Sequence, residues 1–130
     1  MEFLEHSIDA YLKNVYRTLD FGQICIGMLR CLEAFHQRGY IHRDVKPENF
    51  RVHNDKVYLI DFGMYREYKT KEGKHIPYAA GKQFRGTPMT SSIFTHQSSE
   101  PSRRDDLISM VYSALYIQEQ GDLPWLKDCN

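Results

Sequence analysis

Apolar residues recur at helical intervals in the stretch that follows Asp20. The recurring positions i, i+4, i+8 and i+11 are Ile24, Met28, Leu32 and Phe35. This spacing is typical of an α-helix with one buried stripe. Asp20 followed three residues later by Gln23 resembles a capping box, and Gly39 is a residue type that often stands just past a helix end. The pattern therefore predicts a helix that starts at Asp20 and stops at Gly39.

Three further segments have a recognisable pattern. Residues 7–16 read as a short helix, and Asp105 to Ile117 read as a longer one that "GDLPW" ends. The apolar face of the longer helix is predicted to hold Leu107, Met110, Val111, Ala114 and Leu115. The short apolar runs "NFRV" and "KVYLI" are separated by "HND", which predicts a β-hairpin. We therefore expect an α+β fold that is mainly α.

The stretch from Met64 to Pro101 has little periodicity. Gly, Pro, Ser and Thr are scattered through it, so we expect a long loop. Loops of this length in a compact domain are usually functional or disordered.

Composition narrows the class of protein. The chain has 130 residues, 42% hydrophobic and 26% charged, which fits one soluble domain. Lys plus Arg equals Asp plus Glu at 17 each, which argues against a general nucleic-acid or membrane partner. No apolar run is long enough to span a bilayer, and we expect no leader peptide. Cys25, Cys31 and Cys129 are odd in number and lack metal-ligand spacing, so we expect reduced thiols and a cytoplasmic or nuclear location.

The stretch "YIHRDVKPENF", residues 40–50, stands between the long helix and the hairpin. Its charged residues suit either a solvated turn or an active site. A hairpin brings its two ends together, so Asp44, Asn49 and Asp61 should lie close in space. Two carboxylates and an amide oxygen suit a hard cation such as Mg²⁺.

These motifs resemble those of a known family. "HRDVKPEN" is similar to the catalytic loop of protein kinases, and "DFG" after the hairpin is similar to their metal-binding motif. "IHRDVKPENF", "HIPY" and "SRRDDL" resemble the casein kinase 1 group, and "FRGT" and "LPW" resemble its tau-tubulin kinases. The group's S-I-N tripeptide is "SIF" here, residues 92–94. The resemblance covers nearly the whole chain, from the kinase hinge to the helix after the activation segment.

The resemblance implies a Ser/Thr protein kinase that uses ATP and Mg²⁺. Asp44 would accept the proton of the substrate hydroxyl, and Lys46 would neutralise the γ-phosphate. Asn49 and Asp61 would hold magnesium and contact the nucleotide through it. Glu2 and Leu4 match hinge positions whose backbone groups bind adenine.

Four other positions match supporting residues of the family. Thr87 matches a threonine that packs against the catalytic loop. Asp106 matches a helix aspartate that hydrogen-bonds the catalytic-loop backbone; the alternative is a surface acid. His42 and Phe62 are expected to be packing residues.

Residues 61–90 are basic within a chain of zero net charge. The basic side chains are Arg66, Lys69, Lys71, Lys74, Lys82 and Arg85, against Asp61, Glu67 and Glu72. This excess of three positive charges favours acidic or already phosphorylated protein substrates, although a solvated face explains it equally well.

The chain also departs from the family pattern. It contains no G-x-G-x-x-G, so residues 1–130 are expected to form a partial kinase domain without the N-terminal lobe and the last helices of the C-terminal lobe. Arg51 stands where an apolar residue forms the floor of the adenine pocket, Met89 where the group has arginine, and Val111 where kinases have glycine. Three hypotheses stay open: part of an active kinase that is inactive as a piece, a kinase-like binding or scaffold module, and a truncated product without a function of its own.

Overall fold

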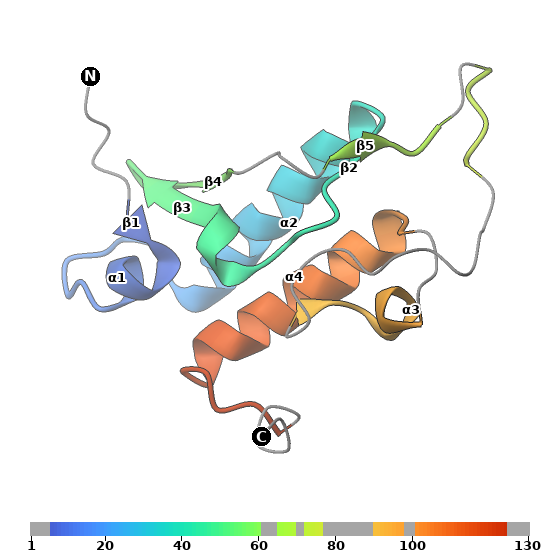
Figure 1. The fold of residues 1–130 in the computed structure, drawn as a ribbon. Coiled ribbons are helices and arrows are strands. Elements are labelled where there is room, and N and C mark those ends of the chain that lie inside the picture. Colours follow the sequence, from blue (N-terminus) through green and yellow to red (C-terminus); the bar gives the residue numbers. More distant parts are fainter. Residues whose placement is uncertain (1–5, 61–64, 70–71, 77–89, 98–100, 125–130) are drawn as a thin grey trace.

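The computed structural model describes residues 6–60, 65–69, 72–76, 90–97 and 101–124 (Figure 1). Their elements are β1 (His6–Ser7), α1 (Ile8–Leu12), α2 (Phe21–Gln37), β2 (Tyr40–Ile41), a 3₁₀ turn η1 (Pro47–Asn49), β3 (Phe50–His53), β4 (Lys56–Leu59), β5 (Arg66–Glu67), α3 (Ile93–His96) and α4 (Arg103–Gln118). The sheet β1-β3-β4 packs on one side of α2, and α4 packs against α2 as well. No helix among the described residues is long and apolar enough to cross a membrane.

Helix α2 forms where the sequence predicts it. The Asp20 carboxylate accepts a hydrogen bond from the Gln23 N–H at 2.8 Å, and the Gln23 side chain accepts one from the Asp20 N–H at 2.8 Å. The predicted capping box is therefore confirmed. Gly39 follows the helix with φ +91°, a left-handed conformation that glycine adopts without strain. The stripe is buried at Ile24, Met28 and Leu32.

The predicted hairpin is confirmed as strands β3 and β4. Its register pairs Phe50 with Leu59 and His53 with Lys56, so a two-residue turn connects the strands. Both turn residues, Asn54 and Asp55, have positive φ, as a type I′ turn requires. Phe50 and Val52 point into the core.

Helix α2 approaches β4 closely at Gly27. A Cβ at this position would lie 2.6 Å from Val57 Cγ2. Gly27 thus lets the helix and the strand approach closely at this point, since no side chain separates them. This close contact fixes helix α2 to the hairpin, and the candidate site lies at the two ends of that hairpin.

The described parts of residues 64–101 hold short elements that the sequence analysis did not predict. Strand β5 pairs antiparallel with β2, Lys69 and His75 form an isolated bridge, and α3 follows further on. Residues 7–16 form a shorter helix than expected, since Ser7 is the N-cap and α1 ends at Leu12. Such short elements lack the repeated periodicity that a sequence pattern needs.

The predicted apolar face of α4 is wrong for three of its five members. Leu107, Val111 and Leu115 are 39%, 50% and 37% exposed. The buried residues are instead Asp105, Asp106, Ser109, Met110, Ser113 and Ile117. The polar ones are tolerated because they are hydrogen-bonded; the Ser113 hydroxyl, for example, donates to the Ser109 carbonyl at 2.7 Å.

Candidate active site

The stretch 40–50 runs from β2 through a loop into η1 and β3. Arg43 has φ +72°, which is uncommon for a residue other than glycine and costs about 1–3 kcal/mol. Such a conformation persists only where surrounding contacts hold it. The conformation of the loop is therefore held by the residues around it and is not that of a relaxed turn.

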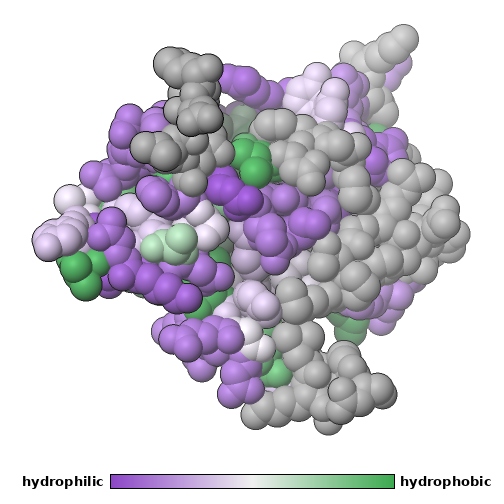
Figure 2. Space-filling model, turned by 60° about the vertical axis from the view of Figure 1, so that its left-hand side comes forward, coloured by the Kyte–Doolittle hydropathy of each residue, from purple (hydrophilic) through white to green (hydrophobic). Residues whose placement is uncertain are grey.

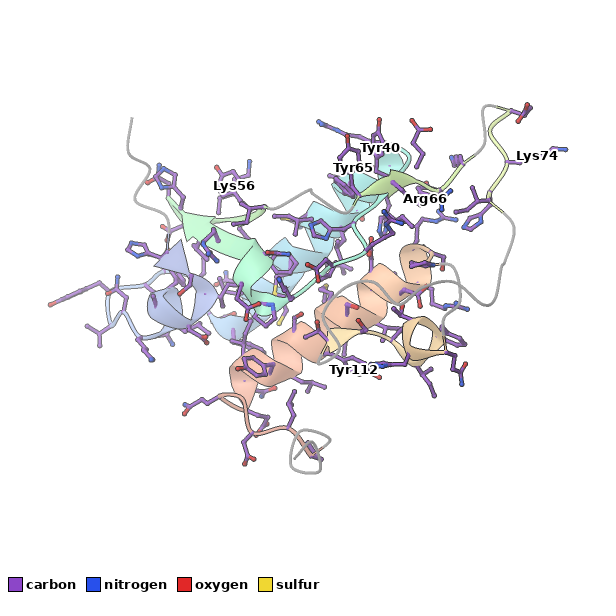
Figure 3. The ribbon with its side chains drawn as sticks, viewed as in Figure 1. Tyr40, Lys56, Tyr65, Arg66, Lys74 and Tyr112 are labelled. Atoms are coloured by element: carbon purple, nitrogen blue, oxygen red, sulfur yellow. The ribbon has the colours of Figure 1, made fainter. Side chains whose placement is uncertain are left out.

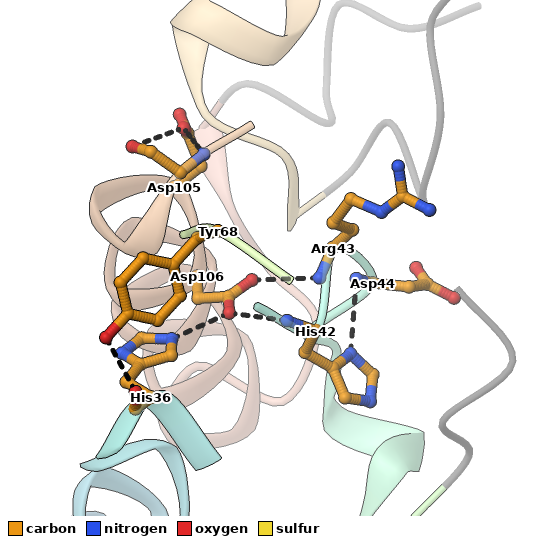
Figure 4. Close-up of polar contacts among 8 residues, drawn as sticks. His36, His42, Arg43, Asp44, Tyr68, Asp105 and Asp106 are labelled. Atoms are coloured by element: carbon orange, nitrogen blue, oxygen red, sulfur yellow. Dashed lines mark hydrogen bonds and ion pairs between the residues drawn. The ribbon is translucent and has the colours of Figure 1, made fainter. Parts of the chain in front are cut away.

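The contacts that hold the loop converge on Asp106 of α4 (Figure 4). Its Oδ2 accepts a hydrogen bond from the His42 N–H at 2.7 Å, and its Oδ1 accepts one from the Arg43 N–H at 3.0 Å. Asp106 is 2% exposed. The prediction that Asp106 hydrogen-bonds the loop backbone is confirmed, and the alternative of a surface acid is wrong.

His36 is a member of this network that the sequence analysis missed. Its Nε2 lies 2.8 Å from Asp106 Oδ2, so the imidazole donates to the same oxygen as the His42 amide. His36 is buried, whereas Phe35 is only partly buried. The available signal was its position four residues after Leu32, which places it on the buried stripe of α2.

The three proposed catalytic residues that the structure describes lie together. Lys46 Nζ is 3.4 Å from Asp44 Oδ2, and their side chains are 26% and 13% exposed. The Asn49 side-chain amide donates to the Asp44 carbonyl at 2.8 Å. The Asp44 N–H donates to Nδ1 of His42, a buried ring that packs as expected. The loop thus presents a carboxylate, a cation and an amide on one short segment.

The end of the hairpin returns to the same loop. The Ile60 N–H donates to the Asn49 carbonyl at 2.7 Å, and the Ile60 carbonyl lies 3.2 Å from His42 Nε2. Ile60 is the residue before Asp61. Asp61 itself lies outside the described residues, as do Glu2, Leu4, Phe62, Thr87 and Met89. Within the described part of the chain, no three His, Cys, Asp or Glu side chains gather as metal ligands.

Tyr68 connects the segment after β5 to the network. Its hydroxyl donates to the His36 carbonyl at 2.7 Å (Figure 4). Its backbone N–H donates to the Gly39 carbonyl at 3.1 Å. The Arg103 guanidinium lies 4.6 Å from the Tyr68 ring centroid, a cation–π contact. At the other end of this short ribbon the Tyr40 and Tyr65 rings meet edge to face at 5.3 Å (Figure 3).

Asp105 holds the segment before α4 much as Asp106 holds the loop 42–49. Its carboxylate accepts hydrogen bonds from the Ser92 hydroxyl and, at 2.8 Å, from the Ser102 N–H. Ser92 is fully buried and its hydroxyl caps α3 by accepting from the Thr95 N–H. The sequence analysis assigned Asp105 no role; the available signal was Ser102 three residues before it, the spacing of a capping box, whereas its partner Ser92 lies 13 residues away.

Arg51 is neither buried without a partner nor fully exposed. It alternates with the buried Phe50 and Val52, so its side chain lies on the sheet face opposite the core. Its guanidinium donates to the carbonyls of Glu48 and Phe50, and the residue as a whole is partly buried. The cost of burying an unpaired guanidinium is thereby avoided.

Known proteins are similar in sequence to this chain. The family model of the protein kinase domain matches residues 1–93. A probable casein kinase I homolog of Encephalitozoon cuniculi is 45% identical over 101 residues. The match covers 77% of this chain, but the chain spans only 31% of that relative's length. The chain belongs to the protein kinase family, in its casein kinase 1 group.

Proposed function

We propose that this chain supplies the catalytic loop of a Ser/Thr protein kinase, which transfers the γ-phosphate of ATP to protein Ser or Thr. The observation that carries the proposal is the loop held by Asp106, with Asp44 and Lys46 side by side at 3.4 Å. Phosphoryl transfer depends mainly on positioning and electrostatic stabilisation, so a loop fixed by buried hydrogen bonds suits it.

Asp44 would accept the proton of the substrate hydroxyl and orient its oxygen. Its carboxylate retains 13% exposure, so a substrate group can reach it from solvent. Lys46 would stand beside it as a positive charge facing the transferred phosphoryl oxygens. A lysine two residues after the aspartate resembles the Ser/Thr form of the kinase loop.

Asn49 fits the role of a magnesium ligand together with Asp61. Its amide nitrogen is used in donating to the Asp44 carbonyl, which fixes the side chain and leaves Oδ1 as the available oxygen. No described residue forms a hydrogen bond with this oxygen. The two hydrogen bonds of Ile60, the residue before Asp61, support the expectation that Asp61 lies close to Asn49. When bound, magnesium neutralises charge on the phosphate oxygens.

The basic residues of positions 61–90 support a preference for acidic or phosphorylated protein substrates. Glu2 and Leu4 are proposed to bind adenine through their backbone. We propose a cytoplasmic or nuclear location, since Cys25 and Cys31 are unpaired thiols.

The test is transfer of labelled phosphate from ATP to casein in the presence of Mg²⁺. We expect transfer by a longer form of the protein that includes a Gly-rich loop, and its loss in Asp44→Asn. We expect no transfer by residues 1–130 alone, because their sequence contains no G-x-G-x-x-G loop that would cover the phosphates and exclude water. Transfer that survives Asp44→Asn in the longer form would overturn the proposal; transfer by residues 1–130 would show that the covering lobe is dispensable.

A further inference from the structure

A groove of about 810 Å³ lies between helix α2 and strand β4. Its volume is within the range of about 300–1,000 Å³ that is typical of ligand sites. Ile26, Phe35 and Cys31 of α2 lie along it, facing Tyr58 and Leu59 of β4. No residue of the catalytic loop 42–49 lines it, so the groove is separate from the candidate active site.

Several apolar side chains of the lining are exposed to solvent. Ile26 is 52% exposed in the middle of a helix, and Tyr58 is 40% exposed on the strand opposite. The face seen in Figure 2 is mostly hydrophilic where it is coloured, with hydrophobic residues in small separate patches. Exposed apolar side chains that line a groove are a common feature of interaction sites.

The charges around the groove are mainly positive. Arg30, Arg38 and Lys56 line it and are exposed, and none of them forms an ion pair with another described residue. Lys56 stands on the β3–β4 hairpin, with its Nζ 5.4 Å from the Tyr58 ring centroid (Figure 3). The acidic residue of the described lining is Asp55, whose Oδ1 already accepts a hydrogen bond from the Tyr11 hydroxyl at 2.9 Å.

The exposed edge of β4 is also occupied in part. The Cys31 thiol donates to the Val57 carbonyl at 3.3 Å and has a further hydrogen bond with the Leu59 backbone. Val57 and Leu59 direct these groups away from β3, toward the groove. A partner strand would have to displace the thiol, so side-chain recognition is favoured over extension of the sheet.

We propose that this groove docks a segment of another protein that carries apolar side chains flanked by Asp or Glu. The apolar side chains bury Ile26, Phe35 and Tyr58, while the acidic ones pair with Arg30, Arg38 and Lys56. The docking concerns recognition rather than phosphoryl transfer, so it can be measured without kinase activity.

The test is the affinity of residues 1–130 for a fluorescent peptide of alternating Leu/Phe and Asp/Glu, without Ser, Thr or Tyr. We expect saturable binding that is at least about tenfold tighter than that of a peptide with Lys in place of the acids. Arg30→Glu/Lys56→Glu and Ile26→Asp should each weaken it about tenfold or more. Lys69→Glu, a single charge reversal in the basic segment 61–90, should change it less than about twofold. Far-UV circular dichroism checks that each variant is folded.

Cysteine labelling locates the bound peptide independently. Cys31 lines the groove, whereas Cys25 lies outside it on the same helix and serves as the internal control. Burial raises the pKa of both thiols, so alkylation is run at alkaline pH and read by mass spectrometry of the two peptides. We expect the peptide to slow labelling of Cys31 and to leave Cys25 unchanged.

Three results would overturn the proposal. The first is no saturable binding, or equal binding of the acidic and basic peptides. The second is loss of binding in Lys69→Glu but not in the groove variants, which would place the peptide on the activation segment. The third is a longer form of the protein in which Cys31 is shielded without peptide, which would show that the occupant belongs to the same molecule.

Discussion

Replacing Asp106 by asparagine is the sharpest test of how the catalytic loop is held. The carboxylate accepts three hydrogen bonds, from the His42 and Arg43 amides and from His36 Nε2, at 2.7, 3.0 and 2.8 Å. An asparagine of the same shape has one oxygen. It can serve either the two donors at Oδ2 or the one at Oδ1, and in both cases its NH₂ group faces a donor.

The size of the destabilisation follows from the hydrogen bonds that asparagine keeps in its better orientation. With its oxygen toward His36 and His42, asparagine loses the bond to Arg43 and replaces two charge-assisted bonds by neutral ones. A hydrogen bond to a charged group contributes about 1.5–3 kcal/mol and a neutral one about 1, and the Arg43 amide is left partly desolvated. We expect a loss of about 2–4 kcal/mol in the free energy of unfolding. The φ of +72° at Arg43 would also lose the support of this hydrogen bond.

Urea unfolding followed by circular dichroism measures the loss, and hydrogen exchange at the His42 and Arg43 amides shows where it arises. Asp9→Asn, at an exposed acid of α1, is the matched control and should change stability by less than about 0.5 kcal/mol. If Asp106→Asn were as mild as the control and exchange at both amides were unchanged, the argument that Asp106 holds the loop would be refuted.

Three further changes test the packing, the nucleotide site and the substrate. Gly27→Ala should destabilise the protein by about 1–3 kcal/mol in urea unfolding, because its Cβ would meet Val57 at 2.6 Å. Gly22→Ala on the same helix, where the nearest atom is 3.4 Å away, should be neutral or stabilising. Equal effects of the two alanines would contradict the close approach. In a longer form that binds ATP, Arg51→Leu should tighten ATP binding measured by calorimetry, because leucine restores the apolar floor of the adenine pocket; weaker or unchanged binding would count against that assignment. A peptide array should show preference for Ser or Thr flanked by acidic residues. A neighbouring phosphoserine should add little, because Met89 stands where the casein kinase 1 group has an arginine that helps to bind such a phosphate. A preference for basic flanks would show that the basic segment does not select substrates.

Local signals predicted much of the structure that positions the site. The Asp20–Gln23 capping box and Gly39 set the bounds of α2, and the runs on either side of "HND" gave the right strands for the hairpin. The same signals failed within residues 64–101, where β5 has two residues and α3 has four. Elements this short are stabilised by their partners rather than by their own periodicity, so the sequence carries little sign of them.

The order of the motifs was enough to identify the kinase family and its casein kinase 1 group, because identity rests on residue types at fixed spacing. The burial of α4 was decided only by tertiary structure. Its apolar residues Leu107 and Val111 are exposed to solvent, while its acidic residues Asp105 and Asp106 are buried. A carboxylate can be buried only where donors meet it, and those of Asp106 lie 63, 64 and 70 residues away along the chain. Spacing within one helix therefore shows which residues share a face, but which face is buried depends on distant segments that satisfy its polar groups.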